Sequence, residues 1–145
     1  MRNVRAFQAL VVLSALIILT TGAMDVALGT APLPGEDAVP VNVDSNYRFF
    51  AAVWLTLGVA LVVVAARVRE PDSAPLLRLV CTAVVLGGLA RVWSIVVAGV
   101  PDPMLLGLLG LEFVLPPILL LWHRALMRGA AATDTAASPV SPVSP

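Results

Sequence analysis

The chain lacks lysine, and its 145 residues include one cysteine, Cys81, and one histidine, His123. A single cysteine cannot form an internal disulfide, and one cysteine with one histidine cannot build a thiolate–imidazole metal site. Only 12% of the residues are charged, against roughly 25% in ordinary soluble domains. Nine arginines balance nine acidic residues, so the chain offers no electrostatic footprint for nucleic acid. These absences exclude a nucleic-acid-binding protein, a disordered protein and a typical soluble enzyme.

Long apolar runs dominate the chain instead. Residues 6–24 and 49–66 carry no charge, residues 79–100 are interrupted only by Arg91, and residues 103–122 only by Glu112. A helix rises about 1.5 Å per residue, so each run approaches the roughly 30 Å of a bilayer's hydrocarbon core. The sequence therefore predicts an all-α polytopic membrane protein, with four transmembrane helices in an antiparallel bundle.

The predicted organisation is one transmembrane domain, residues 1–128, with a tail that follows it. We expect helices at about residues 6–28, 47–66, 76–98 and 103–124, and a disordered Ser/Pro-rich tail over 129–145. The first run is longer than the apolar core of a signal peptide, which favours a retained helix over a cleaved one. Prolines and a glycine predict an irregular connection over residues 29–46, with Asp44 or Ser45 capping the second helix.

Arginine placement predicts the orientation. Seven arginines precede the first run, separate the second from the third, or follow the fourth: Arg2, Arg5, Arg67, Arg69, Arg78, Arg124 and Arg128. The other two connections are acidic, apart from Arg48 at the start of the second run. Because cytoplasmic loops carry the excess of arginine and lysine, we expect a multi-pass protein of the inner membrane with both termini in the cytoplasm.

Arg91 and Glu112 are the charges that fall within apolar runs. Each costs about 2.5–3.5 kcal/mol at mid-membrane on the insertion scale, so each needs a partner. The two are equidistant from the turn between Pro101 and Asp102. In an antiparallel pair of helices they lie at the same depth, which predicts a charge-assisted ion pair.

Other polar residues fall in the same outer half of the membrane. Asp25 closes the first run, Arg48 opens the second, and Ser94 follows Arg91 by three residues. One interpretation is structural: the charges set helix order and register. The other is an outer-leaflet cavity for a polar head group, because ionisable residues within membranes mark functional sites. The candidate ligand-binding cluster is Asp25, Asn46, Arg48, Arg91, Ser94 and Glu112.

The remaining unusual residues receive structural interpretations. Trp54 and Trp93 could line a pocket, but packing within the bundle is favoured. We expect His123 to contact solvent or lipid head groups, and Cys81 to be a small packing residue. Pro116 has no N–H to donate to the Glu112 carbonyl, so a kink is predicted there.

Several of these motifs together resemble a known family. An Asn46–Phe50 element opens the second helix, a Gly-x-x-Arg-x-x-Ser element ends at Ser94, and Glu112 is followed by proline. Their order and spacing resemble a bacterial family of small four-helix membrane proteins catalogued as domain of unknown function 4345. The resemblance covers roughly residues 6–127 and implies the architecture, with Asn46, Arg48, Arg91, Ser94 and Glu112 as the matching positions. It implies no reaction.

The leading interpretation is a membrane protein of unknown biochemical function that serves as a structural component or as a subunit of a membrane complex. The alternative is an intramembrane binding protein, or an enzyme, for a lipid or small amphipathic molecule. In that alternative Arg48 and Arg91 hold an anionic or polar group, and Glu112 orients Arg91. No catalytic triad, phosphate loop or redox motif is visible, so a non-enzymatic role is favoured and an enzymatic one is left open. We expect no cofactor, no bound metal and no nucleic acid; the expected partners are the lipid bilayer, a lipid-like ligand or another membrane protein.

Overall fold

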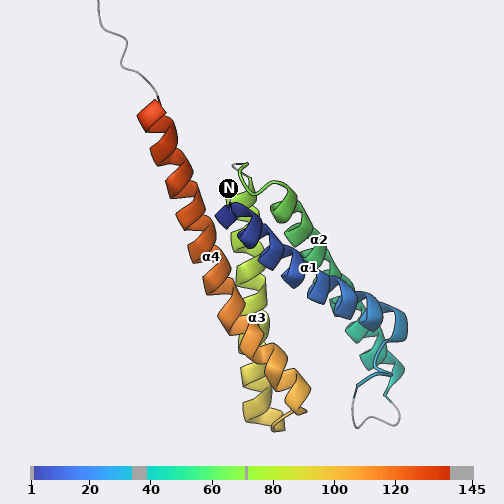
Figure 1. Ribbon diagram of the computed structural model, residues 1–145. Helices are drawn as coiled ribbons and strands as arrows, with labels where there is room; N and C mark the ends of the chain where they lie inside the picture. The colour runs from blue at the N-terminus through green and yellow to red at the C-terminus, as the bar shows by residue number, and fades with distance from the viewer. Residues whose placement is uncertain (1, 34–38, 71, 138–145) are drawn as a thin grey trace, which may run out of the picture.

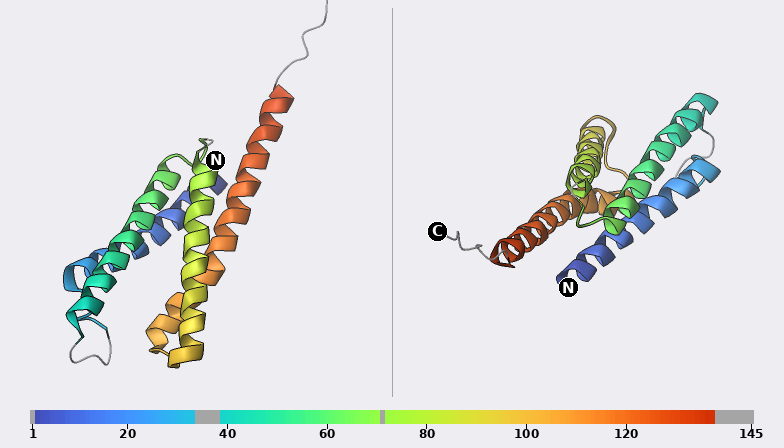
Figure 2. Two further views of the ribbon diagram at one scale, coloured as in Figure 1. Left: turned by 180° about the vertical axis from the view of Figure 1, so that it is seen from behind. Right: turned by 90° about the horizontal axis from the view of Figure 1, so that it is seen from above.

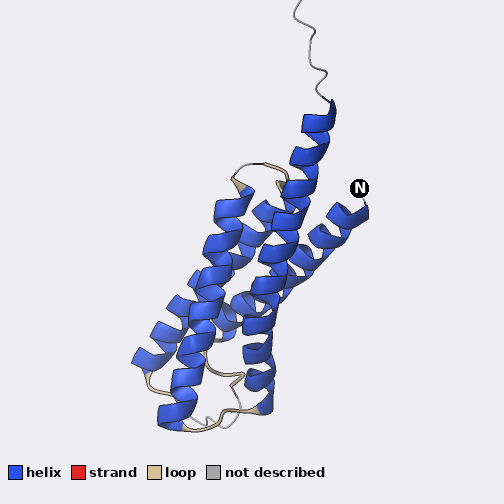
Figure 3. Ribbon diagram, turned by 90° about the vertical axis from the view of Figure 1, so that its left-hand side faces the viewer, coloured by secondary structure: helices blue, strands red, loops and turns tan. Residues whose placement is uncertain are grey.

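The computed structural model describes residues 2–33, 39–70 and 72–137. Within them lie four helices: α1 (Arg2–Leu28), α2 (Val41–Ala66), α3 (Ser73–Ala98) and α4 (Pro103–Ala137). The described part of the chain contains no strand (Figure 3). Each helix contains a span long and apolar enough to cross a membrane. The prediction of an all-α polytopic membrane protein with four spans is confirmed.

The helix boundaries differ from the predicted ones mainly at α2 and α4. Pro40 is the N-cap of α2 and adopts φ −55° and ψ 140°, so the helix begins six residues before the predicted start at residue 47. Proline fixes φ near −65°, which prepares the chain to enter a helix. No side chain caps α2. The predicted cap by Asp44 or Ser45 is therefore wrong, since Asp44 lies inside the first turn.

The last helix passes the predicted end near residue 124 and includes 129–137, where a disordered tail was predicted. This segment is rich in alanine, the best helix former. Adding residues to an existing helix avoids the cost of nucleating a new one, which explains the extension. Residues 138–145, the rest of the predicted tail, lie outside the described residues.

The helices run up and down as two hairpins, α1–α2 and α3–α4 (Figure 1). The chain's start, the connection from α2 to α3 and the far end of α4 lie at one end of the molecule, which we call the closed end. The connections α1–α2 and α3–α4 lie at the opposite, open end. There the two hairpins diverge, as the views in Figures 1 and 2 show.

The buried core occupies the closed half. Its fully buried side chains come from the first half of α1, the last part of α2 and the first turns of α3: Phe7, Val11, Val64, Leu77 and Val80. Phe7 also meets the Trp122 ring edge-on, with ring centroids 5.9 Å apart. In the open half, large apolar side chains on α2 and α3 face outward, Phe49 and Trp93 among them. Trp93 is 67% exposed, so the prediction that it packs within the bundle is wrong.

Small residues let α1 and α2 approach closely along their length. A Cβ on Gly58 would lie 2.9 Å from the Leu19 side chain, and a Cβ on Gly22 would lie 3.1 Å from the Leu55 backbone nitrogen. Close backbone approach at glycine is a usual device of membrane helix pairs, because lipid supplies no hydrophobic drive for association. The two hairpins therefore behave differently: α1 and α2 stay paired while the space opens between them and α3–α4.

Candidate intramembrane binding site

An ion pair joins α3 and α4 in the membrane-spanning region. The Arg91 Nε donates a hydrogen bond to Glu112 Oε1 over 3.0 Å, so the predicted pairing is confirmed. The helices approach closely here because Gly88 lies one turn before Arg91 and has no side chain. A Cβ at Gly88 would lie 3.1 Å from the Phe113 ring.

The two partners of this pair differ in burial. The Glu112 side chain is 9% exposed, whereas the Arg91 side chain is 42% exposed. Glu112 Oε2 is buried and has no hydrogen-bond partner among the described residues. A buried carboxylate oxygen without a partner costs about 1–3 kcal/mol or more. An ion pair that served only to lock the hairpin would be expected to satisfy both oxygens.

A cavity of about 630 Å³ lies between the hairpins, and Arg91 and Glu112 are part of its wall. All four helices contribute side chains, and the volume falls within the 300–1,000 Å³ range of small-molecule sites. Most of the wall is apolar, including Ile17, Ile18, Val84, Leu105, Leu108, Leu111, Leu115 and Leu119. The cavity extends from the core near Cys81 toward the open end at Pro32 and Met104. Cys81 itself is buried and packs in the core, as predicted.

A second polar pair lines the same cavity from α1 and α2. Tyr47 on α2 and Asp25 on α1 both line the cavity, and Asp25 and Arg91 lie within electrostatic range of the Tyr47 hydroxyl. Farther along α2, the Trp54 indole N–H donates to Thr21 Oγ1 over 3.1 Å. The cavity thus combines apolar walls with a few convergent polar groups, an arrangement typical of ligand sites.

Arg48 has a different role from the one the sequence indicated. Its Nε donates to Asp44 over 2.8 Å, and its Nη1 donates to the carbonyls of Val26 and Ala27 at the end of α1. These carbonyls are orphan acceptors at a helix C-terminus, where a cation also interacts favourably with the helix dipole. Arg48 therefore fastens α2 to α1 and is not part of the cavity wall.

The structure brings together three of the six candidate residues. Asp25, Arg91 and Glu112 line the cavity, while Asn46 and Ser94 are exposed outside it. The three-residue spacing predicted that Arg91 and Ser94 lie on one helix face. In the structure Arg91 lines the cavity, whereas Ser94 is exposed outside it. Among the described residues, no group of three or more His, Cys, Asp or Glu side chains could hold a metal ion.

The comparison with protein-family models gives one match that bears on this site. The model described as a domain of unknown function (DUF4345) matches residues 6–123. The chain belongs to this family. The match confirms the resemblance inferred from the motifs and spans all six candidate residues. Neither the curated proteins nor the solved structures include a match.

The sequence motifs did not reveal all the residues that line the cavity. Tyr47 and Trp54 line it but were not among the six candidates, and the sequence offered a pocket role for Trp54 only as the less favoured interpretation. With Phe50 they form an aromatic series on one face of α2, at spacings of three and four residues. This periodicity was a usable signal, although a helical aromatic stripe more often marks ordinary packing.

His123 contradicts its predicted contact with solvent or head groups. It is 4% exposed, and its Nε2 lies 3.1 Å from Ser73 Oγ and 3.2 Å from the Val68 carbonyl oxygen. Because a carbonyl only accepts, a protonated Nε2 donates to Val68, and the Ser73 hydroxyl donates to the Glu70 carbonyl over 2.8 Å. In this arrangement Nε2 is no base for Ser73. The contacts tie α4 to the connection between α2 and α3.

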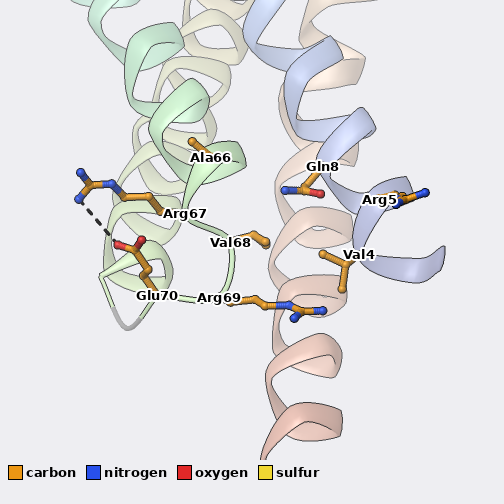
Figure 4. A pocket seen from close by; sticks show the side chains of 8 residues that line it. All are labelled: Val4, Arg5, Gln8, Ala66, Arg67, Val68, Arg69 and Glu70. Atoms are coloured by element: carbon orange, nitrogen blue, oxygen red, sulfur yellow. Dashed lines mark ion pairs between the residues drawn. The ribbon is translucent and has the colours of Figure 1, made fainter. Parts of the chain in front are cut away.

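A smaller hollow of about 310 Å³ lies at the closed end (Figure 4). Arg5, Arg67 and Arg69 line it together with Glu70, which pairs with Arg67 over 3.8 Å. Figure 4 shows Arg5 directed away from the α2–α3 connection, while Arg67 reaches Glu70 on the far side. The three guanidinium groups do not converge on one point, so this hollow is a basic surface near the membrane boundary.

Proposed function

We propose that this protein holds a small amphipathic molecule within the membrane, in the cavity between its two hairpins. One observation carries the proposal: Glu112 lies at the wall of a largely apolar cavity with one buried oxygen unpartnered. Ionisable groups within membranes are expensive and pair with one another or with a ligand. A ligand with an apolar body and a polar head would fill the cavity and satisfy that oxygen.

The hydrogen-bond partners of the polar side chains favour a binding role over a purely structural one. Arg48 and His123 hold helices together, and side-chain nitrogens of both residues have hydrogen-bond partners within the protein. At the Arg91–Glu112 pair, in contrast, a buried carboxylate oxygen of a cavity-lining residue has no hydrogen-bond partner among the described residues. The difference supports a ligand at that pair.

The test is native mass spectrometry of the protein released gently from its membranes. Val84→Trp would place a bulky indole in the cavity and obstruct it, because Val84 lines the wall. Leu86→Trp is the matched control, since Leu86 lies on the same helix, is 59% exposed and is not part of the cavity wall. We expect a defined bound mass on the wild type and the control, and its loss from Val84→Trp. A bound mass that Val84→Trp retains, or a second protein retained by all three forms with no small molecule, would overturn the proposal.

We also propose that the protein lies in the inner membrane with both termini in the cytoplasm. Seven of the nine arginines lie at the closed end, where the first residues of α1, the α2–α3 connection and the end of α4 meet. Such an excess supports a cytoplasmic position for this end. A periplasm-active reporter should be silent when fused after Arg128 and active when fused after Val100. The reverse pattern would refute the orientation.

A further inference from the structure

The charges that line the cavity do not balance. Among the described residues of the wall, the charged side chains are Asp25, Arg91 and Glu112. Arg91 is committed to Glu112 at 3.0 Å. Asp25 forms no ion pair within 4.0 Å among the described residues. With both carboxylates ionised, the set carries a formal net charge of −1.

The other base at this end of the molecule is not available to Asp25. Arg48 is held by Asp44 and by the carbonyls of Val26 and Ala27. Leaving these partners would expose the end of α1. The polar neighbour that the structure gives Asp25 is the Tyr47 hydroxyl, which carries no charge. Asp25 is only partly exposed and lies in a membrane-spanning helix, where an uncompensated carboxylate is costly.

The aromatic side chains of the wall add a second preference. Tyr47, Phe50 and Trp54 line the cavity from one face of α2. Aromatic faces attract cations, and the attraction strengthens when the cation is removed from water. A carboxylate beside aromatic rings favours a positively charged head group over a negatively charged one.

The unpartnered oxygen of Glu112 limits further which chemical class of head group fits the cavity. Glu112 Oε2 can only accept hydrogen bonds when the carboxylate is ionised. A protonated amine at the cavity wall supplies N–H donors for this oxygen, once the Glu112 carboxylate turns it toward the cavity, and a positive charge for Asp25. A quaternary ammonium supplies the charge without donors, and an alcohol supplies a donor without the charge.

Building on the proposed function, we infer that the cavity takes a cationic amphiphile: a molecule with an apolar chain and a protonated amine head, which Asp25 and Glu112 hold. The apolar wall formed by Ile18, Leu108, Leu111 and Leu115 receives the chain. Arg91, which the sequence assigned to an anionic group, instead pairs with Glu112 and orients it.

The experiment uses four probes with the same twelve-carbon chain: dodecylamine, dodecyltrimethylammonium, dodecanol and dodecanoate. Each competes with a fluorescent alkylamine for the full-length protein in lipid nanodiscs, and signals from empty nanodiscs are subtracted. We expect dodecylamine to bind at least tenfold more tightly than dodecanol and dodecanoate. Dodecyltrimethylammonium should fall between the amine and the alcohol.

Two variants test the assignment to Asp25. Asp25→Asn keeps the shape and removes the charge, and it should weaken dodecylamine at least tenfold while leaving dodecanol unchanged. Asp102→Asn is the matched control, because Asp102 is an exposed carboxylate at the same end and is not part of the cavity wall. Its amine affinity should equal that of the wild type.

The outcomes separate this inference from the proposed function. If dodecanoate or dodecanol binds as tightly as the amine, or if Asp25→Asn keeps the amine preference, the cationic head group is refuted while a binding cavity stands. If the nanodisc-embedded wild type binds none of the four probes and native mass spectrometry finds no bound molecule, the proposed function fails as well. Should Asp25→Asn fail to fold, the ranking of the four probes on the wild type decides the inference.

Discussion

Gly29 shows how a single position couples the ends of two helices. It follows α1 with φ +62°, a conformation that side chains with a Cβ rarely adopt. Its neighbour Thr30 donates its backbone N–H to Asp44 over 3.0 Å, and Asp44 accepts from Arg48. The chain at Gly29 passes so close to this ion pair that a Cβ there would overlap both side chains.

We therefore expect Gly29→Ala to destabilise the protein by about 1 kcal/mol or more, through backbone strain and displacement of Asp44 and Arg48. Thermal unfolding in detergent micelles measures the effect. Gly87→Ala is the control, because a Cβ at Gly87 meets nothing within 4 Å and alanine is the better helix former. Equal melting temperatures for the two variants would show that the backbone conformation of Gly29 and the Asp44–Arg48 contacts beside it contribute little to stability.

At the scale of elements, α4 is held in two places by different chemistry. Within the membrane-spanning part of α4, Glu112 pairs with Arg91 on α3. At the closed end, His123 contacts the connection between α2 and α3. Pro116 and Pro117 lie between these two places without ending the helix, and the ribbon of α4 bends in its first third (Figure 1). The kink predicted at Pro116 stays a prediction.

The joint at His123 gives a prediction about α4. His123→Leu replaces the imidazole with an apolar side chain of similar bulk and removes the donor to the Val68 carbonyl. The Ser73 hydroxyl, 3.2 Å from the same carbonyl, can still donate to it, so we expect the loss of one hydrogen bond, about 0.5–1.5 kcal/mol of stability. Arg124→Gln, at the exposed neighbouring position, should leave stability unchanged. A His123→Leu protein as stable as the wild type would mean that packing alone holds α4 at the closed end.

At the scale of the whole molecule, the two halves have different tasks. The closed half contains the buried core, and the open half contains diverging hairpins with the polar end of the cavity between them. In a membrane the outward-facing residues of the open half meet lipid, so their exposure is no liability. The apolar burial that stabilises the fold therefore lies mainly in the closed half, and the space between the hairpins in the open half can provide a site.

Two leucines of α3 test this division. Leu77 is fully buried in the closed half, whereas Leu89 is 52% exposed in the open half. Leu77→Ala leaves a cavity in the core, for which about 2–5 kcal/mol is typical. Leu89→Ala removes the same atoms from a surface that lipid can refill, so we expect a change near zero. Both are measured by unfolding in the same micelles. Comparable losses would show that the open half also holds the fold.

The sequence alone predicted the four spans, their up-and-down order and the Arg91–Glu112 pair. These follow from local physics: the length of each apolar run, the cost of a charge in lipid and the equal distances from one turn. It also indicated the family through the order of a few polar motifs. Each of these properties is set by residues near one another along the chain, or by one hairpin.

The tertiary structure decided what depends on how the two hairpins meet. It gave Arg48 to the end of α1, buried His123 against Ser73, and assembled the cavity wall from Asp25 and Tyr47 on one hairpin and Glu112 on the other. These residues lie 22 to 87 positions apart in the sequence, and no helical period specifies the angle between two hairpins. The sequence therefore determined the helices and their charges, and packing decided which charges found partners and which were left facing the cavity.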